Sequence, residues 1–178
     1  MVITGSKIDC LGSGRKENVE QSWRNLKIST LGPETCKKLT TDGTELKQAH
    51  VYQSEPLDCP EDSPVFLNTV IELSYDGTPA ELLQQTQAIE RQMGRDVIRE
   101  KNAPRIIDID ILYFGTTSHH EASLSLPHPE MTRRRFVLQP LADIRPELIL
   151  PGDDITIADH LQHLDSAEPP LSLIQASW

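Results

Sequence analysis

The chain has 178 residues, of which 17 are basic and 27 are acidic, and its formal net charge is −10. This length can bury a sizeable core, so we expect a single domain over residues 1–178, with its core in 8–150 and a tail in 151–178. The acidic balance argues against a protein that binds nucleic acid through a broadly basic surface.

Cellular location is constrained by the absence of targeting and disulfide signals in the sequence. No apolar run approaches the length of a membrane span, and the first residues lack the pattern of a signal peptide. Cys10, Cys36 and Cys59 are odd in number and widely spaced, which fits neither a disulfide framework nor a zinc site. We therefore expect a cytoplasmic protein.

Hydrophobic periodicity and turn signals predict elements in the order β-α-β-β-α-β, followed by helical segments. The predicted elements are a strand at 7–11, a helix at 17–31, strands at 48–54 and 65–75, a helix at 79–94, a strand at 106–114, a helical segment at 131–141 and short helices with a tail from 151. This order predicts an α+β fold with a ferredoxin-like βαββαβ antiparallel sheet, helices packed on it and a C-terminal helical appendage.

The second predicted helix has a clear start signal. Thr78 suits the N-cap, Pro79 suits the first helical position, and Glu81 completes a capping box with Thr78. Gly94 ends the pattern.

The most informative segment is the strand that runs from Ile106 to Phe114. Side chains alternate across a strand, so Ile107, Ile109 and Ile111 share one face and Asp108 and Asp110 share the other. Two carboxylates on an otherwise apolar strand are costly unless a cation neutralises them, and Mg²⁺ suits them because it takes few carboxylates and completes its shell with water and phosphate oxygens. An Asp-x-Asp pair is most often only a solvated strand face, and sugar-nucleotide transferases also use one.

Basic residues flank the two aspartates on both sides. One cluster precedes them and includes Arg95 and Arg105, and a second is the run of arginines at 133–135. Each cluster alone is typical of a solvated surface. Together with the aspartates, they indicate a clamp for phosphate groups.

Several further motifs are arranged around this strand. They are Phe66-Leu67-Asn68, Ala88-Ile89-Glu90, Gly94-Arg95, Ala103-Pro104-Arg105, Leu126-Pro127-His128-Pro129 and Arg134-Arg135-Phe136-Val137-Leu138-Gln139-Pro140-Leu141. With these motifs, the chain resembles the 6-hydroxymethyl-7,8-dihydropterin pyrophosphokinases of folate biosynthesis, from about Ile8 to about Leu150. The resemblance implies transfer of pyrophosphate from ATP to the hydroxymethyl group of the pterin, with two Mg²⁺ ions, AMP as the second product and a monomeric enzyme whose partners are only these small molecules.

The resemblance also implies a role for particular residues. Asp108 and Asp110 would hold the metal ions and, with Arg95 and Arg105, form the catalytic group. The residues that would contact ATP are Leu83, Glu90, Arg95, Arg105, Ile111, His128 and Arg134. The residues that would contact the pterin are Ser54, Leu57, Phe66, Asn68 and Phe136.

Two positions depart from the family pattern. Gly14 stands where the family usually has asparagine, and Asn102 stands where a bulky residue often covers the ligands. An alternative is therefore a non-catalytic pterin- or nucleotide-binding relative, against which the intact aspartate pair argues. A third possibility is an RNA-binding ferredoxin-like module, which the acidic charge and the 4% aromatic content disfavour.

Overall fold

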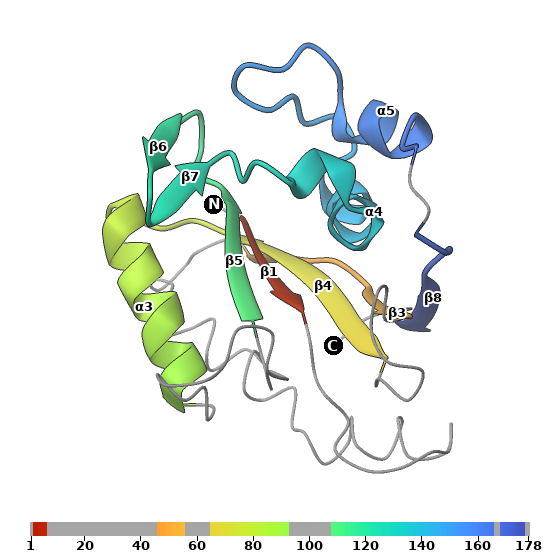
Figure 1. Ribbon diagram of the computed structural model, residues 1–178, viewed down its shortest axis with the longest axis horizontal. Coiled ribbons are helices and arrows are strands. Elements are labelled where there is room, and N and C mark those ends of the chain that lie inside the picture. The colour runs from red at the N-terminus through yellow and green to blue at the C-terminus, as the bar shows by residue number, and fades with distance from the viewer. Residues whose placement is uncertain (1, 7–45, 56–64, 93–107, 166–167, 177–178) are drawn as a thin grey trace.

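A computed structural model describes residues 2–6, 46–55, 65–92, 108–165 and 168–176, with backbone only for 2–6. The main sheet contains β1 (Val2–Ser6), β2 (Leu46–Gln48), β3 (Val51–Ser54), β4 (Phe66–Leu73), β5 (Asp108–Tyr113) and β8 (Ser172–Gln175). A separate hairpin joins β6 (His119–Glu121) to β7 (Leu124–Leu126). The helices are α3 (Pro79–Gln92), α4 (Arg135–Ile144) and α5 (Ile157–Gln162), with a 3₁₀ turn, η2, at Met131–Arg133. The described part of the chain is thus a mixed α and β structure (Figure 1).

The strand order brings distant segments of the chain side by side. It reads β5-β1-β4-β3-β8, every neighbouring pair is antiparallel, and β2 also pairs with β4. Ser6 of β1 lies between Asn68 of β4 and Asp108 of β5. Residues that are paired across a sheet share a face, so this register places Asn68 and Asp108 on the same face.

Helices cover both faces of the sheet, and the two faces of each strand enter different apolar clusters. On one face, α3 packs with the odd-numbered residues of β4 and β5, among them Ile71, Ile109 and Ile111. On the other face, α4, η2 and α5 pack against the even-numbered residues Val70 and Leu112. The predicted alternation in both strands is therefore confirmed.

The predicted start of α3 is confirmed in detail. The backbone N–H of Thr78 donates to Glu81 Oε2 at 2.7 Å, and the N–H of Glu81 donates back to Thr78 Oγ1 at 3.3 Å. The Thr78 hydroxyl also donates to Glu81 Oε2, at 2.9 Å. The two hydrogen bonds that the Glu81 carboxylate accepts, from the Thr78 backbone and then from its hydroxyl, lower the pKa of the carboxyl. Thr156 and Asp159 form a second capping box at the start of α5.

The structure differs from the sequence-based prediction at several places. The first described strand is Val2–Ser6, which was not predicted, whereas the predicted strand at 7–11 and the helix at 17–31 lie outside the described residues. The predicted strand at 48–54 is divided into β2 and β3 by Ala49 and His50, and 119–126 forms a hairpin that was not predicted. The C-terminal segment is not wholly helical, because β8 follows α5 and extends the sheet beside β3.

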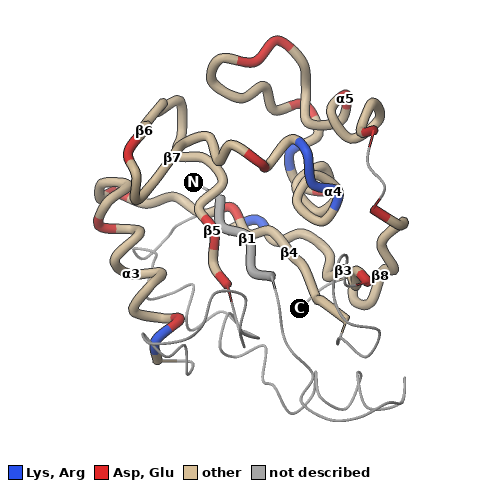
Figure 2. The backbone as a smooth tube through the Cα atoms, in the orientation of Figure 1, with Lys and Arg blue, Asp and Glu red and all other residues tan. Residues whose placement is uncertain are grey.

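Charged residues are unevenly distributed over the described elements. Figure 2 shows the arginines around the start of α4 as one basic stretch beside the sheet, while acidic residues are scattered over many elements. Within the described ranges, no helix combines the length and the apolar character needed to cross a membrane.

Candidate functional site

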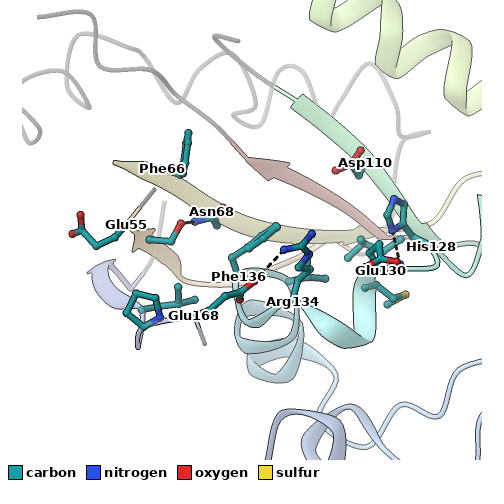
Figure 3. Close-up of a pocket in the computed structure, with 15 residues that line it drawn as sticks. Glu55, Phe66, Asn68, Asp110, His128, Glu130, Arg134, Phe136 and Glu168 are labelled. Carbon is teal, nitrogen blue, oxygen red and sulfur yellow. Dashed lines mark hydrogen bonds and ion pairs between the residues drawn. The ribbon is translucent and has the colours of Figure 1, made fainter. Parts of the chain in front are cut away.

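A cavity of about 360 Å³ opens on the α4 side of the sheet. Strands β3, β4 and β5, the turn after β7, the start of α4 and the C-terminal segment all contribute to its walls (Figure 3). The lining residues are Ser54, Glu55, Phe66, Asn68, Asp110, Leu112, His128, Glu130, Met131, Arg134, Phe136, Val137, Glu168, Pro169 and Leu171. Its volume falls within the range of small-molecule sites.

Seven residues that the resemblance placed in the site lie together in this cavity. They are Ser54, Phe66, Asn68, Asp110, His128, Arg134 and Phe136. They come from five separated segments, and only the fold brings them together. These seven residues therefore bring to one cavity apolar rings, one side-chain amide, one carboxylate and two basic side chains.

Strand β5 supplies the acidic part of the site. Asp110 lines the cavity, and alternation puts Asp108 on the same face, because Ile109 and Ile111 pack toward α3. Both carboxylates are half-buried, and each has partners in the structure. Among the described residues, no group of three or more His, Cys, Asp or Glu side chains is arranged to hold a metal ion. Mg²⁺ nevertheless accepts a pair of carboxylates, because water and phosphate oxygens can fill its other coordination positions.

Asn68 forms the polar floor at the other end of the cavity. Its side chain is 2% exposed, and Nδ2 donates to Ser54 Oγ at 3.0 Å. Tyr52 and Asn68 are paired in the ladder of β3 and β4, and the same ladder pairs Ser54 with Phe66. The sheet therefore holds a buried amide and a hydroxyl in a fixed arrangement beside an aromatic ring.

One ring nitrogen of His128 already takes part in a hydrogen bond within the protein, and the other does not take part in that bond. Its backbone N–H donates to the carbonyl of Leu112 at 2.7 Å, and its Nδ1 accepts from the N–H of Glu130 at 3.2 Å. In the neutral imidazole, acceptance at Nδ1 places the proton on Nε2. His128 is therefore set up to donate a hydrogen bond from Nε2, as a phosphate oxygen requires.

Arg134 lies at the rim of the cavity, directly before α4. Its side chain is 48% exposed, and Nη1 lies 3.5 Å from Oε1 of Glu168. Oε2 of Glu168 accepts from the backbone N–H of Arg135 at 2.7 Å. An arginine that offers several donors at such a rim can bind an anion in the cavity.

Two hydrogen-bonded networks fix the sheet that carries the site. Glu72 accepts from Tyr113 Oη at 2.7 Å and from Arg145 Nε at 2.7 and 2.9 Å, which joins β4 and β5 to the end of α4. Burial acts to raise the pKa of Glu72, but the hydrogen bonds from Arg145 and Tyr113 outweigh it, so the pKa is lowered. Tyr52 donates to Asp143 at 2.9 and 3.0 Å, and burial together with this carboxylate raises the pKa of Tyr52 to about 12.

Other predicted site residues lie outside this cavity. Leu83, Glu90 and Ile111 are on the α3 side of the sheet, where Ile111 is buried in the apolar cluster and Leu83 packs against it. Glu90 is 2% exposed, and its Oε1 accepts from the N–H of Ile109 at 2.8 Å. Their predicted contacts with ATP remain predictions. Leu57, Arg95 and Arg105 lie outside the described residues.

The contribution of the C-terminal segment to the cavity was not predicted. Glu168, Pro169 and Leu171 line the cavity although they lie more than thirty positions after Arg134 in the sequence. The alternation of Leu171 and Leu173 after two prolines was the available signal for a strand, but nothing in it indicated which strand it would join.

Comparison with known proteins gives the family. The family model described as 7,8-dihydro-6-hydroxymethylpterin-pyrophosphokinase (HPPK) matches residues 8–146. A 2-amino-4-hydroxy-6-hydroxymethyldihydropteridine pyrophosphokinase from Pseudomonas aeruginosa is 44% identical over 120 residues, which cover 67% of this chain and 69% of the relative. One from Synechocystis is 37% identical over 64% of this chain and 57% of its own length.

Longer proteins share the same segment. The folic acid synthesis protein fol1 of Pneumocystis carinii is 34% identical over 74% of this chain, but the match spans only 18% of that protein. A crystal structure of Plasmodium falciparum HPPK-DHPS with pterin and p-hydrobenzoate has a TM-score of 0.54, with 15% identity over 90% of this chain and 43% of that one. This likeness concerns the fold alone. The extent of the family match and the identity to the Pseudomonas relative show that the chain belongs to the 7,8-dihydro-6-hydroxymethylpterin-pyrophosphokinase family.

Proposed function

We propose that the protein transfers pyrophosphate from ATP to the hydroxymethyl group of 6-hydroxymethyl-7,8-dihydropterin, a step in tetrahydrofolate biosynthesis. The pterin hydroxyl oxygen forms a bond to the β-phosphorus, and the bond from that phosphorus to the α–β bridging oxygen breaks. AMP leaves with the bridging oxygen, and the hydroxyl proton is lost to solvent or to a nearby base. The proposal rests on one observation. Asn68, Phe66 and Phe136 line the same cavity as Asp110 and Arg134.

The pterin would occupy the end of the cavity near β3 and β4. A pterin has apolar faces and a polar edge, so two aromatic rings and a buried amide suit its shape. Phe66 and Phe136 would contact the faces, Asn68 would bond to the edge, and Ser54 would fix the Asn68 amide as it does in the structure. Leu57 would complete this end from the segment after β3.

The triphosphate would occupy the end near β5 and α4. His128 would donate to it from Nε2, and Arg134 would bind it with the exposed part of its guanidinium. Arg95 and Arg105 would add positive charge to the triphosphate site. Leu83, Glu90 and Ile111 would contact ATP. Transfer of this kind depends on positioning and charge neutralisation more than on covalent chemistry.

Asp108 and Asp110 would hold two Mg²⁺ ions. When bound, Mg²⁺ neutralises developing charge on the phosphate oxygens and helps to align the two substrates. The carboxylates of β5 contribute by presenting two oxygen ligand groups on one strand face, at the cavity and away from the apolar cluster around α3.

We also propose a topology for the sheet, a domain organisation and a cellular location. The order β5-β1-β4-β3 with antiparallel neighbours supports a ferredoxin-like βαββαβ arrangement whose first helix is the predicted segment 17–31. We further propose a single domain over 1–178, with its core in 8–150, that works as a cytoplasmic monomer with ATP and the reduced pterin as its only partners.

The test is an assay with ATP, MgCl₂ and the hydroxymethyl dihydropterin that measures AMP. AMP should form only when all three are present, and the other product should be the pterin diphosphate. A protein that binds both substrates without forming AMP would be a non-catalytic relative, and this result would overturn the proposal. Release of ADP in place of AMP would also overturn it, because it would indicate transfer of a single phosphoryl group.

A further inference from the structure

Glu168 places a carboxylate in the cavity wall, although it comes from the C-terminal segment beyond the family match at 8–146. Its side chain is 9% exposed. A carboxylate with so little exposure needs hydrogen-bond donors, and two successive residues at the start of α4 provide them. Glu168 is therefore tied to the rim of the proposed triphosphate site.

The two bonds that this carboxylate makes with described residues of α4 and its N-cap differ in length. The bond to the backbone N–H of Arg135 is short, at 2.7 Å, and that N–H belongs to the first turn of α4, where helix N–H groups have no intrahelical partner. The positive end of the helix dipole also favours a carboxylate at this place. This bond fixes Glu168, and the fixed carboxylate then faces Nη1 of Arg134 at 3.5 Å.

The C-terminal segment is anchored on its other side by the sheet. In the ladder of β3 and β8, Tyr52 pairs with Leu173 and Gln53 pairs with Ser172. Pro169 and Leu171 bridge these two anchors and line the cavity. Glu168 is thus held by α4 at one end and by an adjacent paired strand at the other. Its carboxylate therefore has a fixed position beside a half-exposed arginine.

Arg134 retains most of its binding capacity in this arrangement. A guanidinium has five N–H donors, and the contact with Glu168 uses Nη1 at a long distance. Figure 3 shows Arg134 between Phe136 and the acidic part of the cavity, with the contact to Glu168 on one side. Within the described part of the chain, the rest of the fork is left to an anion in the cavity.

We propose that Glu168 is a positioning residue, which holds the guanidinium of Arg134 at the cavity rim in the orientation that binds the triphosphate of ATP. This inference rests on the proposed function, because it gives Arg134 a triphosphate ligand. It adds to that function a residue from the C-terminal segment that acts through Arg134 and does not touch the substrate.

The test compares steady-state kinetics of the full-length wild type with Glu168→Gln. Glutamine keeps the length of the side chain and can still accept from the Arg135 N–H, so the fold is retained, but it removes the charge that holds Arg134. The KM for ATP should rise roughly threefold to tenfold, while the KM for the pterin stays unchanged. In an Arg134→Gln background, the same change at Glu168 should have no further effect on the KM for ATP.

A charge-matched control separates positioning from general electrostatics. Glu55→Gln removes a negative charge from an exposed residue that lines the same cavity. Removing a negative charge near a polyphosphate should not raise the KM for ATP. A rise with Glu168→Gln and none with Glu55→Gln supports positioning, whereas equal effects of the two variants would overturn it.

A readout that needs no turnover keeps this inference separate from the proposed function. The mobility of the Arg134 side chain, followed by ¹⁵N relaxation of its guanidinium, should increase in Glu168→Gln. If the wild type forms no AMP but this mobility increases, the proposed function fails and the positioning contact stands. If the KM for ATP falls in Glu168→Gln, Glu168 competes with ATP for Arg134, and the inference is wrong. An unchanged mobility together with an unchanged KM would also overturn it.

Discussion

Replacing Asn68 by alanine should weaken pterin binding and leave ATP binding nearly unchanged. Asn68 is 2% exposed and lies on the cavity floor, so a ligand that reaches it meets an amide that is already removed from water. Within the described residues, one amide hydrogen donates to Ser54 Oγ. The second amide hydrogen and the carbonyl oxygen can then bond to the polar edge of the pterin.

The magnitude follows from these two available groups. A hydrogen bond of this type contributes about 0.5–1.5 kcal/mol net, so the loss of two should cost about 1–3 kcal/mol. Since about 1.4 kcal/mol corresponds to a factor of ten, the dissociation constant for the pterin should rise roughly 5-fold to 150-fold. ATP binding should change little, because the proposed triphosphate ligands come from β5, His128 and the start of α4.

Calorimetric titration with each ligand separately measures both constants. Thr69→Val is a matched control, because Thr69 is the next residue of β4, is also buried and donates from Oγ1 to the carbonyl of Ala49 at 3.3 Å. It does not line the cavity. The control should lower thermal stability without changing pterin affinity. Equal losses of pterin and ATP binding in Asn68→Ala would refute the reasoning, because they would indicate a general folding defect.

Three further predictions concern the metal site, the acid stability and the core. Asp110→Asn should abolish AMP formation without lowering the melting temperature in the absence of Mg²⁺, because the change relieves repulsion with Asp108; near-normal turnover would exclude a metal role. The pKa of Glu72 is lowered in the folded state, so its contribution to stability is present above about pH 4.5 and is lost as the pH falls through the folded value; acid unfolding of Glu72→Gln should show a shallower loss in this window. Leu138→Ala should cost about 2–5 kcal/mol in urea unfolding, because this side chain is fully buried against the sheet, and a loss below 1 kcal/mol would contradict this packing.

Local patterns were sufficient to predict much of the described fold. The capping box of Thr78 and Glu81 marked the start of α3, and the alternation in β4 and β5 separated the two faces of the sheet correctly. These features depend on residues within a few positions of one another. His128 also lies at the cavity, and its contact with the triphosphate stays a prediction.

The features that were missed depend on contacts between distant segments. The strand β8 is four residues long and mostly exposed, and it forms because β3 offers an unpaired edge. The burial of Glu168 depends on where α4 begins relative to the tail, which no local pattern specifies. The hairpin β6–β7 contains two histidines and a glutamate in a three-residue strand, a composition that resembles a loop.

Glu90 shows how one buried carboxylate can serve the site from the other face of the sheet. Surface exposure is the usual state of a helical glutamate, but Glu90 is buried, and it accepts from the N–H of Ile109. The strand order places β5 at the edge of the sheet, so this bond satisfies a backbone donor on its outer side. Ile109 lies between Asp108 and Asp110, and the bond therefore fixes the backbone segment that carries both carboxylates. Helix α3 therefore supports the strand segment that carries the proposed metal ligands through this hydrogen bond as well as through its apolar packing against Ile109 and Ile111.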